Sequence, residues 1–487
     1  MKISRPPIET LCVCLLAFAA SSFLVPKALF GDGSTLAILY SGREYGTGNY
    51  IHAAYMPLAR LLGFFQGLVS EGRSPVDVLS FVSRFAGSLG LAIVFASCRA
   101  CNVSSLVALA SVGLAATSSG FFFFTRVVEV HAVQFLGSSI ALCLVVAYAR
   151  HRVSAWLVMF LLPPILFLSH QTSLLLIPGS VAYVLAREWH LARTSREVWK
   201  RIVVIFIASV VGGIGGVFAA AWLREMAVLD LISGSTSLVH SSFQTGKIPA
   251  LFRGQVLPLV GFWLLLLPVA LARQPRTWPV RVALFISIGV PFLFFAIWGV
   301  PERGAYTLGY LPVMTLAVAL LMERVYRRGL FVIVLWLVGF VGQSTLSVFS
   351  QVQFLNGRHG IQGRSSLEAV AGCLVEFQPP RLLVTIDPAL QSVAGLVDGT
   401  LELRFYPHIR DAQYAGRNPQ DWSSVFGQWL LDHAKEADVQ LFLDRSYMEY
   451  EGIGADFWPY VTEFERYLDM HSSVEELLDG RVWVVDY

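Results

Sequence analysis

The sequence predicts a mostly α-helical, polytopic membrane protein with a small α/β domain at its C-terminal end. Three observations support this fold class. Of the 487 residues, 55% are hydrophobic and only 14% are charged, against about 25% charged in an ordinary soluble domain. Charge-poor windows long enough to cross a bilayer recur along the first 349 residues, and acidic residues gather in the remainder. Soluble, disordered, collagen-like and disulfide-scaffold proteins are thereby excluded.

About eleven segments are apolar enough to span a membrane, since a spanning helix needs roughly 20 apolar residues. They cover residues 11–25, 78–97, 100–125, 132–149, 153–169, 171–186, 202–223, 254–272, 282–301, 304–322 and 329–346. Arg84 is the one charged residue inside these windows. Residues 1–22 also fit a cleaved signal peptide, but a retained anchor is favoured because cleavage would leave the following loop untethered.

Positive residues predict the orientation, because cytoplasmic loops are enriched in Lys and Arg. Basic residues precede the first window and then occupy alternate loops, at 99, 150–152, 187–201, 273–281 and 324–328. We therefore expect a multi-pass protein with a cytoplasmic N-terminus and an extracytoplasmic C-terminal domain. The polar sequence Ser169-His170-Gln171-Thr172 then forms an outer hairpin tip between two short helices.

The net charge of +3 combines two opposite parts. Residues 1–349 carry 26 basic and 12 acidic residues, and residues 350–487 carry 10 and 21. This asymmetry predicts a membrane domain over 1–349 and a water-facing domain over 350–487. The basic residues are scattered between apolar windows, which argues against a nucleic-acid partner.

The C-terminal domain is predicted to be a layered, Rossmann-like α/β unit. Strands are expected at 381–386, 400–406, 439–443 and 482–485, with helices at 422–437 and 458–468. No glycine-rich phosphate loop follows the first strand, so nucleotide binding is unsupported. A structural cap over the membrane domain and an acceptor-docking module both remain open.

Polar residues in the predicted outer loops are the candidates for chemistry. Taken singly, each is ordinarily a solvated loop residue, but several stand flush with a helix end, where a buried charge is costly. A shared site in which opposite charges and a ligand compensate one another explains their position. The candidates are Asp32, His52, Arg84, Arg126, Glu129, His170, Arg303 and Tyr306.

These residues lie in short motifs that resemble those of GT-C membrane glycosyltransferases. Asp32-Gly33-Ser34 is followed by His52-Ala53-Ala54-Tyr55-Met56-Pro57-Leu58, in a stretch with the spacing of an interfacial helix. This opening is similar to that of the DUF2723 group, which is related to protein O-mannosyltransferases. The motifs around Arg84, Arg126–His131, Ser169–Gln171 and Glu302–Tyr306 resemble later segments of the same class. The sequence departs from the group where Ser34-Thr35 replaces a second acid and His131 replaces a tyrosine.

The resemblance implies transfer of a sugar from a polyprenyl-phosphate carrier to a protein, glycan or lipid acceptor on the outer face. Asp32 would be the general base for the acceptor hydroxyl, and a single displacement would invert the anomeric centre. Arg303, then Arg126 and Arg84, would stabilise the leaving phosphate. Glu129 would orient an arginine, because Arg126 and Glu129 are three residues apart and would share a helix face.

The other candidates have competing interpretations. His170 would contact phosphate or sugar, although a buried, neutral, hydrogen-bonded histidine explains it equally well. Tyr306 and Tyr310 could stack on a sugar, but an interfacial tyrosine belt is favoured. Asp32, Glu129 and His170 together could hold a divalent metal. Nothing in their spacing demands one, and we expect neither metal nor cofactor.

Two other functions remain open from the sequence. A transporter or lipid flippase predicts inverted repeats and polar groups near mid-membrane, whereas the polar groups here cluster at one face and no repeat is visible. A non-catalytic membrane scaffold predicts no dependence on any single outer-loop acid. The glycine run at 212–216 is interpreted as close helix packing.

Overall fold

The computed structural model describes residues 6–23, 28–29, 53–67, 75–128, 130–192, 194–223, 228–229, 278–297, 308–326, 363–385, 400–405, 416–445 and 458–487, with a few isolated positions between them. The chain divides into two compact units. The first unit is Met1–Val25 with Thr47–Gln353, and the second is Pro26–Gly46 with Phe354–Tyr487. Each is described by itself.

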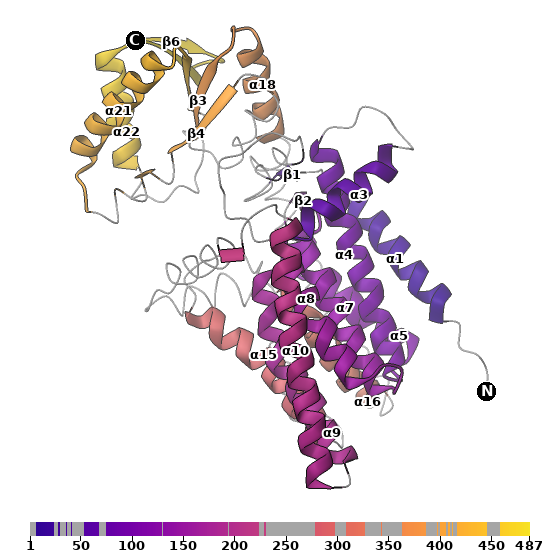
Figure 1. The fold of residues 1–487 in the computed structure, drawn as a ribbon. Helices are drawn as coiled ribbons and strands as arrows, with labels where there is room; N and C mark the ends of the chain where they lie inside the picture. Colours follow the sequence, from indigo (N-terminus) through magenta and orange to yellow (C-terminus); the bar gives the residue numbers. More distant parts are fainter. Residues whose placement is uncertain are drawn as a thin grey trace. The chain divides into compact units, whose positions relative to one another are not determined.

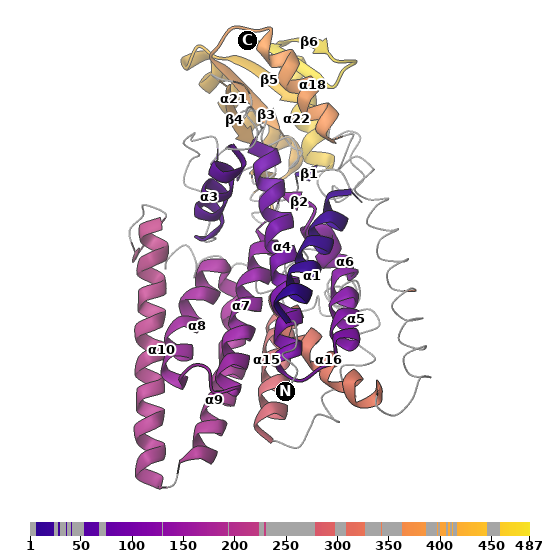
Figure 2. The same ribbon diagram turned by 90° about the vertical axis from the view of Figure 1, so that its right-hand side faces the viewer.

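The first unit is a helix bundle (Figures 1 and 2). Its elements are α1 (Pro6–Phe23), α3 (Tyr55–Gly67), α4 (Pro75–Ala100), α5 (Ser105–Ala116), α6 (Ser119–Phe124), β2 (Val127–Val128), α7 (His131–Ala149), α8 (Ala155–Ser169), the 3-10 helix η1 (Gln171–Leu176), α9 (Ile177–Leu191), α10 (Ser195–Leu223), α15 (Trp278–Ile297) and α16 (Leu311–Tyr326). Helix α4 packs between α1 and α7, α8 packs on α7 and α10, and α9 packs on α15. Figure 2 shows α8 and α10 side by side.

Three helices in the described part of the chain are long and apolar enough to cross a membrane. They are Asp77–Ala100, His131–Ala149 and Ser195–Leu223. Four shorter apolar helices accompany them, at Pro7–Ser22, Ser105–Ala116, Ala155–Ser169 and Val282–Pro291. The expected number of about eleven spans stays a prediction, and the windows at 254–272 and 329–346 lie outside the described residues, as does the expected domain boundary at 349/350.

One predicted span is not a single helix. Residues 100–125 form two helices, α5 and α6, separated at Thr117 and Ser118. The hydroxyl of Thr117 donates to the Gly113 carbonyl (3.0 Å), and that of Ser118 donates to the Ala115 carbonyl (2.7 Å). These local bonds satisfy the last carbonyl groups of α5 and favour its termination. The predicted break at His170 does occur, between α8 and η1.

The glycine run in α10 explains how α8 and α10 approach closely. A Cβ on Gly212 would lie 2.0 Å from the carbonyl oxygen of Phe160, and one on Gly216 would lie 2.8 Å from Cα of Pro164. Gly213 and Gly215 have open space or ordinary contact distances around them. The two glycines of the GxxxG pair, Gly212 and Gly216, therefore pack directly against α8, as the close-packing interpretation requires.

The bundle has two chemically different ends. At one end Arg99 pairs with Glu9 (3.3 Å), and Arg150 donates to Asn102 (2.9 Å). We call this the basic end; it also carries Arg152, Arg187, Lys200 and Arg201, close to the junction of α9 and α10 at the bottom of Figure 1. At the other end of α1 and α4, Ser22 accepts a hydrogen bond from Arg84 (3.3 Å). Arg84 precedes Arg99 by 15 residues, or roughly 22 Å along the helix.

The C-terminal part of the second unit has three layers around a five-stranded sheet in the order β4-β3-β5-β7-β6. The strands are β3 (Arg381–Thr385), β4 (Thr400–Arg404), β5 (Gln440–Asp444), β6 (Ser473–Leu477) and β7 (Val482–Asp486). β3 is parallel to both β4 and β5, whereas β6 and β7 form an antiparallel hairpin that joins β5 through β7. The remaining elements of the unit are β1 (Ala28–Leu29), α18 (Gly363–Val375), α21 (Pro419–Glu436) and α22 (Trp458–His471).

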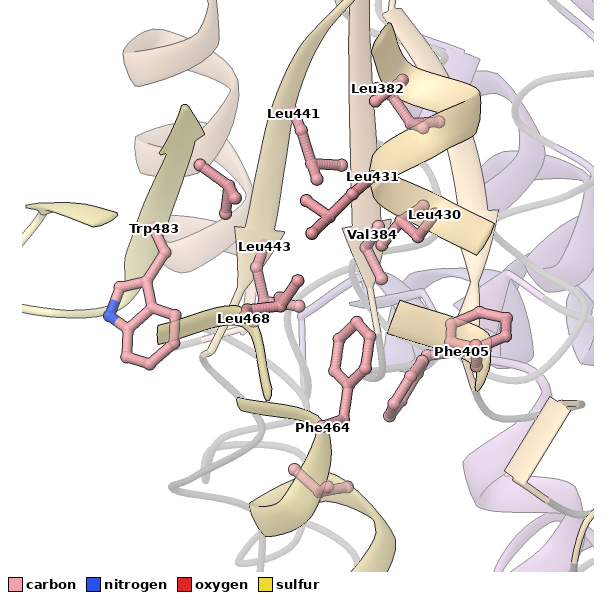
Figure 3. Packing of buried hydrophobic residues seen from close by; sticks show 14 of the residues in the cluster. Leu382, Val384, Phe405, Leu430, Leu431, Leu441, Leu443, Phe464, Leu468 and Trp483 are labelled. Carbon is pink, nitrogen blue, oxygen red and sulfur yellow. The ribbon is translucent and has the colours of Figure 1, made fainter. Parts of the chain in front are cut away.

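Alternating strand residues supply two cores. Leu382, Val384, Leu441 and Leu443 pack with Phe464 of α22 and with residues of α21 on one face of the sheet (Figure 3). On the other face, Leu383 and Phe442 pack with residues of α18. This alternation is the period-two pattern of a sheet covered on both sides. The four predicted strands and two predicted helices are present, but β6 and α18 were not predicted.

Candidate functional site

Arg126 is the most unusual charged residue in the bundle because it is buried without an acidic partner in the described part of the chain. Its residue surface is 5% exposed. Nη1 donates to the Phe122 carbonyl (2.8 Å) and to the Thr125 hydroxyl (3.1 Å), and the guanidinium carbon lies 3.6 Å from the centre of the Phe122 ring. Nε is buried and makes no hydrogen bond. Within the described part of the chain, its partners are thus neutral oxygens and a ring, which do not offset its positive charge.

A second arginine adds to this charge. Burial, and secondarily the charge of Arg84, lowers the pKa of Arg126 to about 9. Arg84 donates from Nε to the Ser80 carbonyl (3.1 Å) and from Nη1 to Ser22. Burial and the charge of Arg84 both disfavour the charged form of Arg126, so an anion bound next to its guanidinium would stabilise that form.

Gly87 allows α4 to contact the turn that carries Arg126. A Cβ on Gly87 of α4 would lie 2.4 Å from Cγ2 of Thr125, so a larger residue would push the 125–126 turn off the helix. The turn then continues as the extended strand β2 rather than as a helix. The expectation that Arg126 and Glu129 share a helix face is therefore wrong for the segment up to residue 128. Glu129 itself lies outside the described residues.

Beside the arginines, two histidines lie at the start of α7 and the end of α8. His131 and His170 are 2% and 4% exposed, and their ring centres are 5.2 Å apart. The ring of Phe124, at the end of α6, lies 4.9 Å from that of His131. The aromatic residues of α6 thus connect the arginine turn to the histidine pair.

A directed chain of hydrogen bonds joins the two histidines. His131 Nδ1 lies 2.9 Å from Gln134 Oε1, Gln134 Nε2 donates to Thr172 Oγ1 (2.9 Å), and Thr172 Oγ1 lies 2.8 Å from His170 Nδ1. The Thr172 backbone N–H also donates to His170 Nδ1 (3.2 Å). An amide oxygen only accepts, so His131 Nδ1 carries a proton. His170 Nδ1 accepts, so the ring of His170 is neutral with its proton on Nε2.

Another segment of the chain reaches this network. Gly309 lies so close to it that a Cβ there would be 2.7 Å from Gln134 Nε2. Tyr310, which follows, is 4% exposed, so it does not belong to an interfacial belt. The described residues that follow Arg303 and Tyr306 therefore pack on the histidine network, while Arg303 and Tyr306 lie outside the described part.

The segment after His52 approaches the same end of α8. Ala54 N–H donates to the Leu168 carbonyl (3.0 Å), two residues before His170. Helix α3 follows, burying Tyr55 and leaving Leu61, Phe64 and Phe65 more than half exposed; that it lies at a membrane interface stays a prediction. Asp32 and His52 lie outside the described residues.

Three of the eight predicted site residues can thus be placed: Arg84, Arg126 and His170, all away from the basic end. Sequence reasoning did not single out Gln134 and Thr172, which fix the histidine tautomers. An amide within an otherwise apolar window was the available signal for Gln134. No group of three potential metal ligands occurs among the described residues. Asp32 and Glu129, the acids considered for a metal with His170, are not among them, so the absence of a metal stays a prediction.

The fold is that of GT-C glycosyltransferases. The structure of ArnT from Cupriavidus metallidurans bound to undecaprenyl phosphate matches with a TM-score of 0.60 at 12% identity, over 98% of this chain and 97% of that one. Its apo form gives a TM-score of 0.59 over the same shares. The archaeal oligosaccharyltransferase AglB from Archaeoglobus fulgidus, in complex with an inhibitory peptide and a dolichol-phosphate, matches with a TM-score of 0.57 at 14% identity, over 98% of this chain and 74% of that one.

No family model and no curated sequence matches the chain. The similarity to the DUF2723 group therefore rests on the motifs alone. The apolar helices and the membrane-protein neighbours indicate an integral membrane protein.

Proposed function

We propose that this protein is a membrane glycosyltransferase that moves a sugar from a polyprenyl-phosphate carrier to an acceptor at the end of the bundle that carries Arg126. The observation that supports this most directly is the buried guanidinium of Arg126, which has no acidic partner among the described residues and feels the charge of Arg84, in a fold shared with proteins bound to undecaprenyl phosphate and dolichol-phosphate.

The chemistry requires a cation where the lipid phosphate leaves. As the acceptor oxygen bonds to the anomeric carbon, the bond from that carbon to the phosphate oxygen breaks, and the phosphate gains negative charge. An arginine that is held in place and shielded from water stabilises that charge without further reorganisation. Arg126 meets this condition because two hydrogen bonds and the Phe122 ring hold its guanidinium.

His170 supplies a neutral donor in the proposal. Because the hydroxyl and the backbone N–H of Thr172 both donate to Nδ1, the imidazole ring of His170 is held in one orientation, which fixes the direction of its Nε2–H. A neutral N–H binds a phosphate or sugar oxygen without adding another charge to the site of the two arginines. His131 and Gln134 maintain that orientation from α7.

The acceptor hydroxyl must lose its proton as it attacks. We assign Asp32 as the carboxylate that takes this proton, with Arg303 as a further phosphate ligand and inversion at the anomeric carbon as the outcome. These assignments rest on the motif resemblance. The acceptor is a protein, a glycan or a lipid, and the reaction face is the extracytoplasmic one if the predicted orientation holds.

A carrier-binding experiment tests the phosphate part of the proposal. Purified protein in detergent is titrated with undecaprenyl phosphate, and complex formation is followed by native mass spectrometry. Arg126→Gln should bind about 10- to 100-fold more weakly, which corresponds to losing a charge-assisted hydrogen bond. Arg187→Gln, a charge-matched change at the basic end, should bind as the wild type does. Equal binding by wild type and Arg126→Gln would contradict the assignment.

A further inference from the structure

A second polar site lies at the basic end of the bundle, far along the helices from Arg126. A cavity of about 610 Å³ opens between the α7–α8 connection, the end of α9 and the beginning of α10. Its polar lining includes Tyr148, Arg152, Glu188, Lys200 and Arg201. We call it the basic-end pocket. The proposed transferase chemistry uses none of these residues.

One acid in this pocket is already satisfied. Glu188 accepts a hydrogen bond from the Tyr148 hydroxyl (2.6 Å) and pairs with Arg201. Arg201 also pairs with Glu197 one turn earlier in α10 (2.7 Å). This network fastens α7, α9 and α10 together, and the charge of Glu188 is offset by that of Arg201.

Two cations in the pocket remain available. Among the described residues, the exposed side chains of Arg152 and Lys200 make no hydrogen bond or ion pair. The neighbouring His151 adds no charge while its Nε2 accepts from Arg187 (2.7 Å). With Arg201 offset by Glu188 and Glu197, the charged groups of the pocket and their direct partners leave an excess of one positive charge, so the complement is a group with one negative charge and several acceptor oxygens.

Most of the rest of the lining is apolar. Trp156, Leu191, Val204 and Ile205 form the apolar wall. Trp156 of the lining is 51% exposed, and Trp189 of α9 and Trp199 of α10 are 63% and 67% exposed; exposed tryptophans are typical of a membrane interface. The candidate span Ser195–Leu223 begins at this pocket. The pocket thus offers cations to a headgroup and an apolar surface to the chain below it.

We propose that the basic-end pocket binds an anionic glycerophospholipid, with its phosphate at Arg152 and Lys200 and an acyl chain along Val204 and Ile205. A free inorganic anion would satisfy the two cations but would leave the apolar wall unused. A zwitterionic lipid would use the wall but would bring its own cation to the charged rim. The bound lipid ties the α7–α8 connection to α10, and this role is independent of the proposed transfer reaction.

The test uses the full chain and a matched pair of double variants. Protein is reconstituted in vesicles of phosphatidylcholine with spin-labelled phosphatidylglycerol, and the bound lipid fraction is measured by electron paramagnetic resonance. Each charge-assisted hydrogen bond to the lipid phosphate contributes a factor of about ten, so Arg152→Gln/Lys200→Gln should weaken the association by about 100-fold. Arg150→Gln/Arg196→Gln removes two exposed charges from the same two segments, outside this pocket, and should leave the association unchanged.

Two further measurements distinguish binding of an anionic lipid from binding of any lipid or of free phosphate. Spin-labelled phosphatidylcholine should show no variant-dependent binding, and millimolar inorganic phosphate should not displace phosphatidylglycerol. The proposal is overturned if both double variants lose the same affinity, if phosphatidylcholine binds as tightly as phosphatidylglycerol, or if inorganic phosphate competes fully.

Discussion

The hydroxyl of Thr172 lies 2.8 Å from Nδ1 of His170, and the Thr172 backbone N–H donates to the same nitrogen at 3.2 Å. Because Nδ1 accepts, the proton of His170 is held on Nε2. His170 caps the N-terminus of η1 through this contact with Thr172. Its tautomer is thus set by the capping contact and, through the bond from Gln134 to Thr172, by helix α7.

Removing the Thr172 hydroxyl should reduce sugar transfer without unfolding the bundle. Thr172→Val keeps the shape of the side chain but breaks the link from Gln134 to His170, so we expect a roughly tenfold lower transfer rate, the worth of about one hydrogen bond. Thr172→Ser retains the hydroxyl and should retain most activity. Initial rates of transfer in detergent measure the difference, and a fully active valine variant would show that the chain does not orient His170.

A lysine at position 126 should make carrier binding dependent on pH. Burial and then Arg84 lower the pKa of Arg126 to about 9, and the same surroundings would lower that of a lysine, ordinarily about 10.4. The cationic form binds phosphate, so binding by Arg126→Lys should rise as the pH falls from about 8 to 6, whereas Arg126 stays protonated over that range. Titration with undecaprenyl phosphate at both pH values checks this. A lysine variant whose affinity follows the wild type at both would contradict it.

The α8–α10 contact should tolerate alanine at one glycine but not at another. A Cβ at Gly212 would overlap the backbone carbonyl of Phe160, so Gly212→Ala should destabilise the protein by about 1–3 kcal/mol. Gly215 faces open space, and Gly215→Ala should be neutral or stabilising by up to about 1 kcal/mol. Thermal unfolding in one detergent compares the two variants. Equal melting temperatures would show that the helices do not pack through Gly212.

The second unit should lose stability in alkali through Tyr487. Its hydroxyl donates toward the carbonyl groups of Ala434 and Val439 (2.9 and 2.6 Å), and partial burial, followed by the charge of Asp438, raises its pKa. The pKa of Tyr487 is thus higher in the folded protein than in the unfolded one. The contribution of its hydroxyl to the free energy of unfolding is therefore complete below about pH 10 and is lost as the pH rises through the folded pKa. Proteolysis of the second unit should accelerate above that pH in wild type, and less so in Tyr487→Phe. The same acceleration in both proteins would assign the effect to other groups.

Much of the second unit follows from local sequence pattern. The run Leu382–Val384 is entirely apolar, because its alternate residues face α18 on one side and α21 and α22 on the other. Strand β6 escaped prediction since its sequence, Ser473–Leu477, contains two glutamates at an edge where only part of each side chain is covered. Helix α18 was also not predicted, because only a narrow stripe of apolar residues, including Val370 and Leu374, packs on the sheet.

The membrane unit was predictable in its hydrophobic windows but less so in its site. The break at His170 could be read from four consecutive polar residues. The separation of α5 from α6 could not, because Thr117 and Ser118 bind their own helix and carry no charge to interrupt a hydrophobic window. Arg126 was identified as a charge at a helix end, but its burial without an acidic partner among the described residues depends on three-dimensional packing.

Sugar transfer from a polyprenyl phosphate at the end of the bundle carrying Arg126 is tested by counting transferred label. Purified wild type, Asp32→Asn and Arg126→Gln are incubated with radiolabelled polyprenyl-phosphate sugars and membrane extract as the source of acceptor, and transferred label is counted. Wild type should transfer label, Asp32→Asn should transfer none although it still binds undecaprenyl phosphate, and Arg126→Gln should bind about 10- to 100-fold more weakly and transfer correspondingly less. Wild-type transfer by Asp32→Asn and Arg126→Gln alike would contradict it.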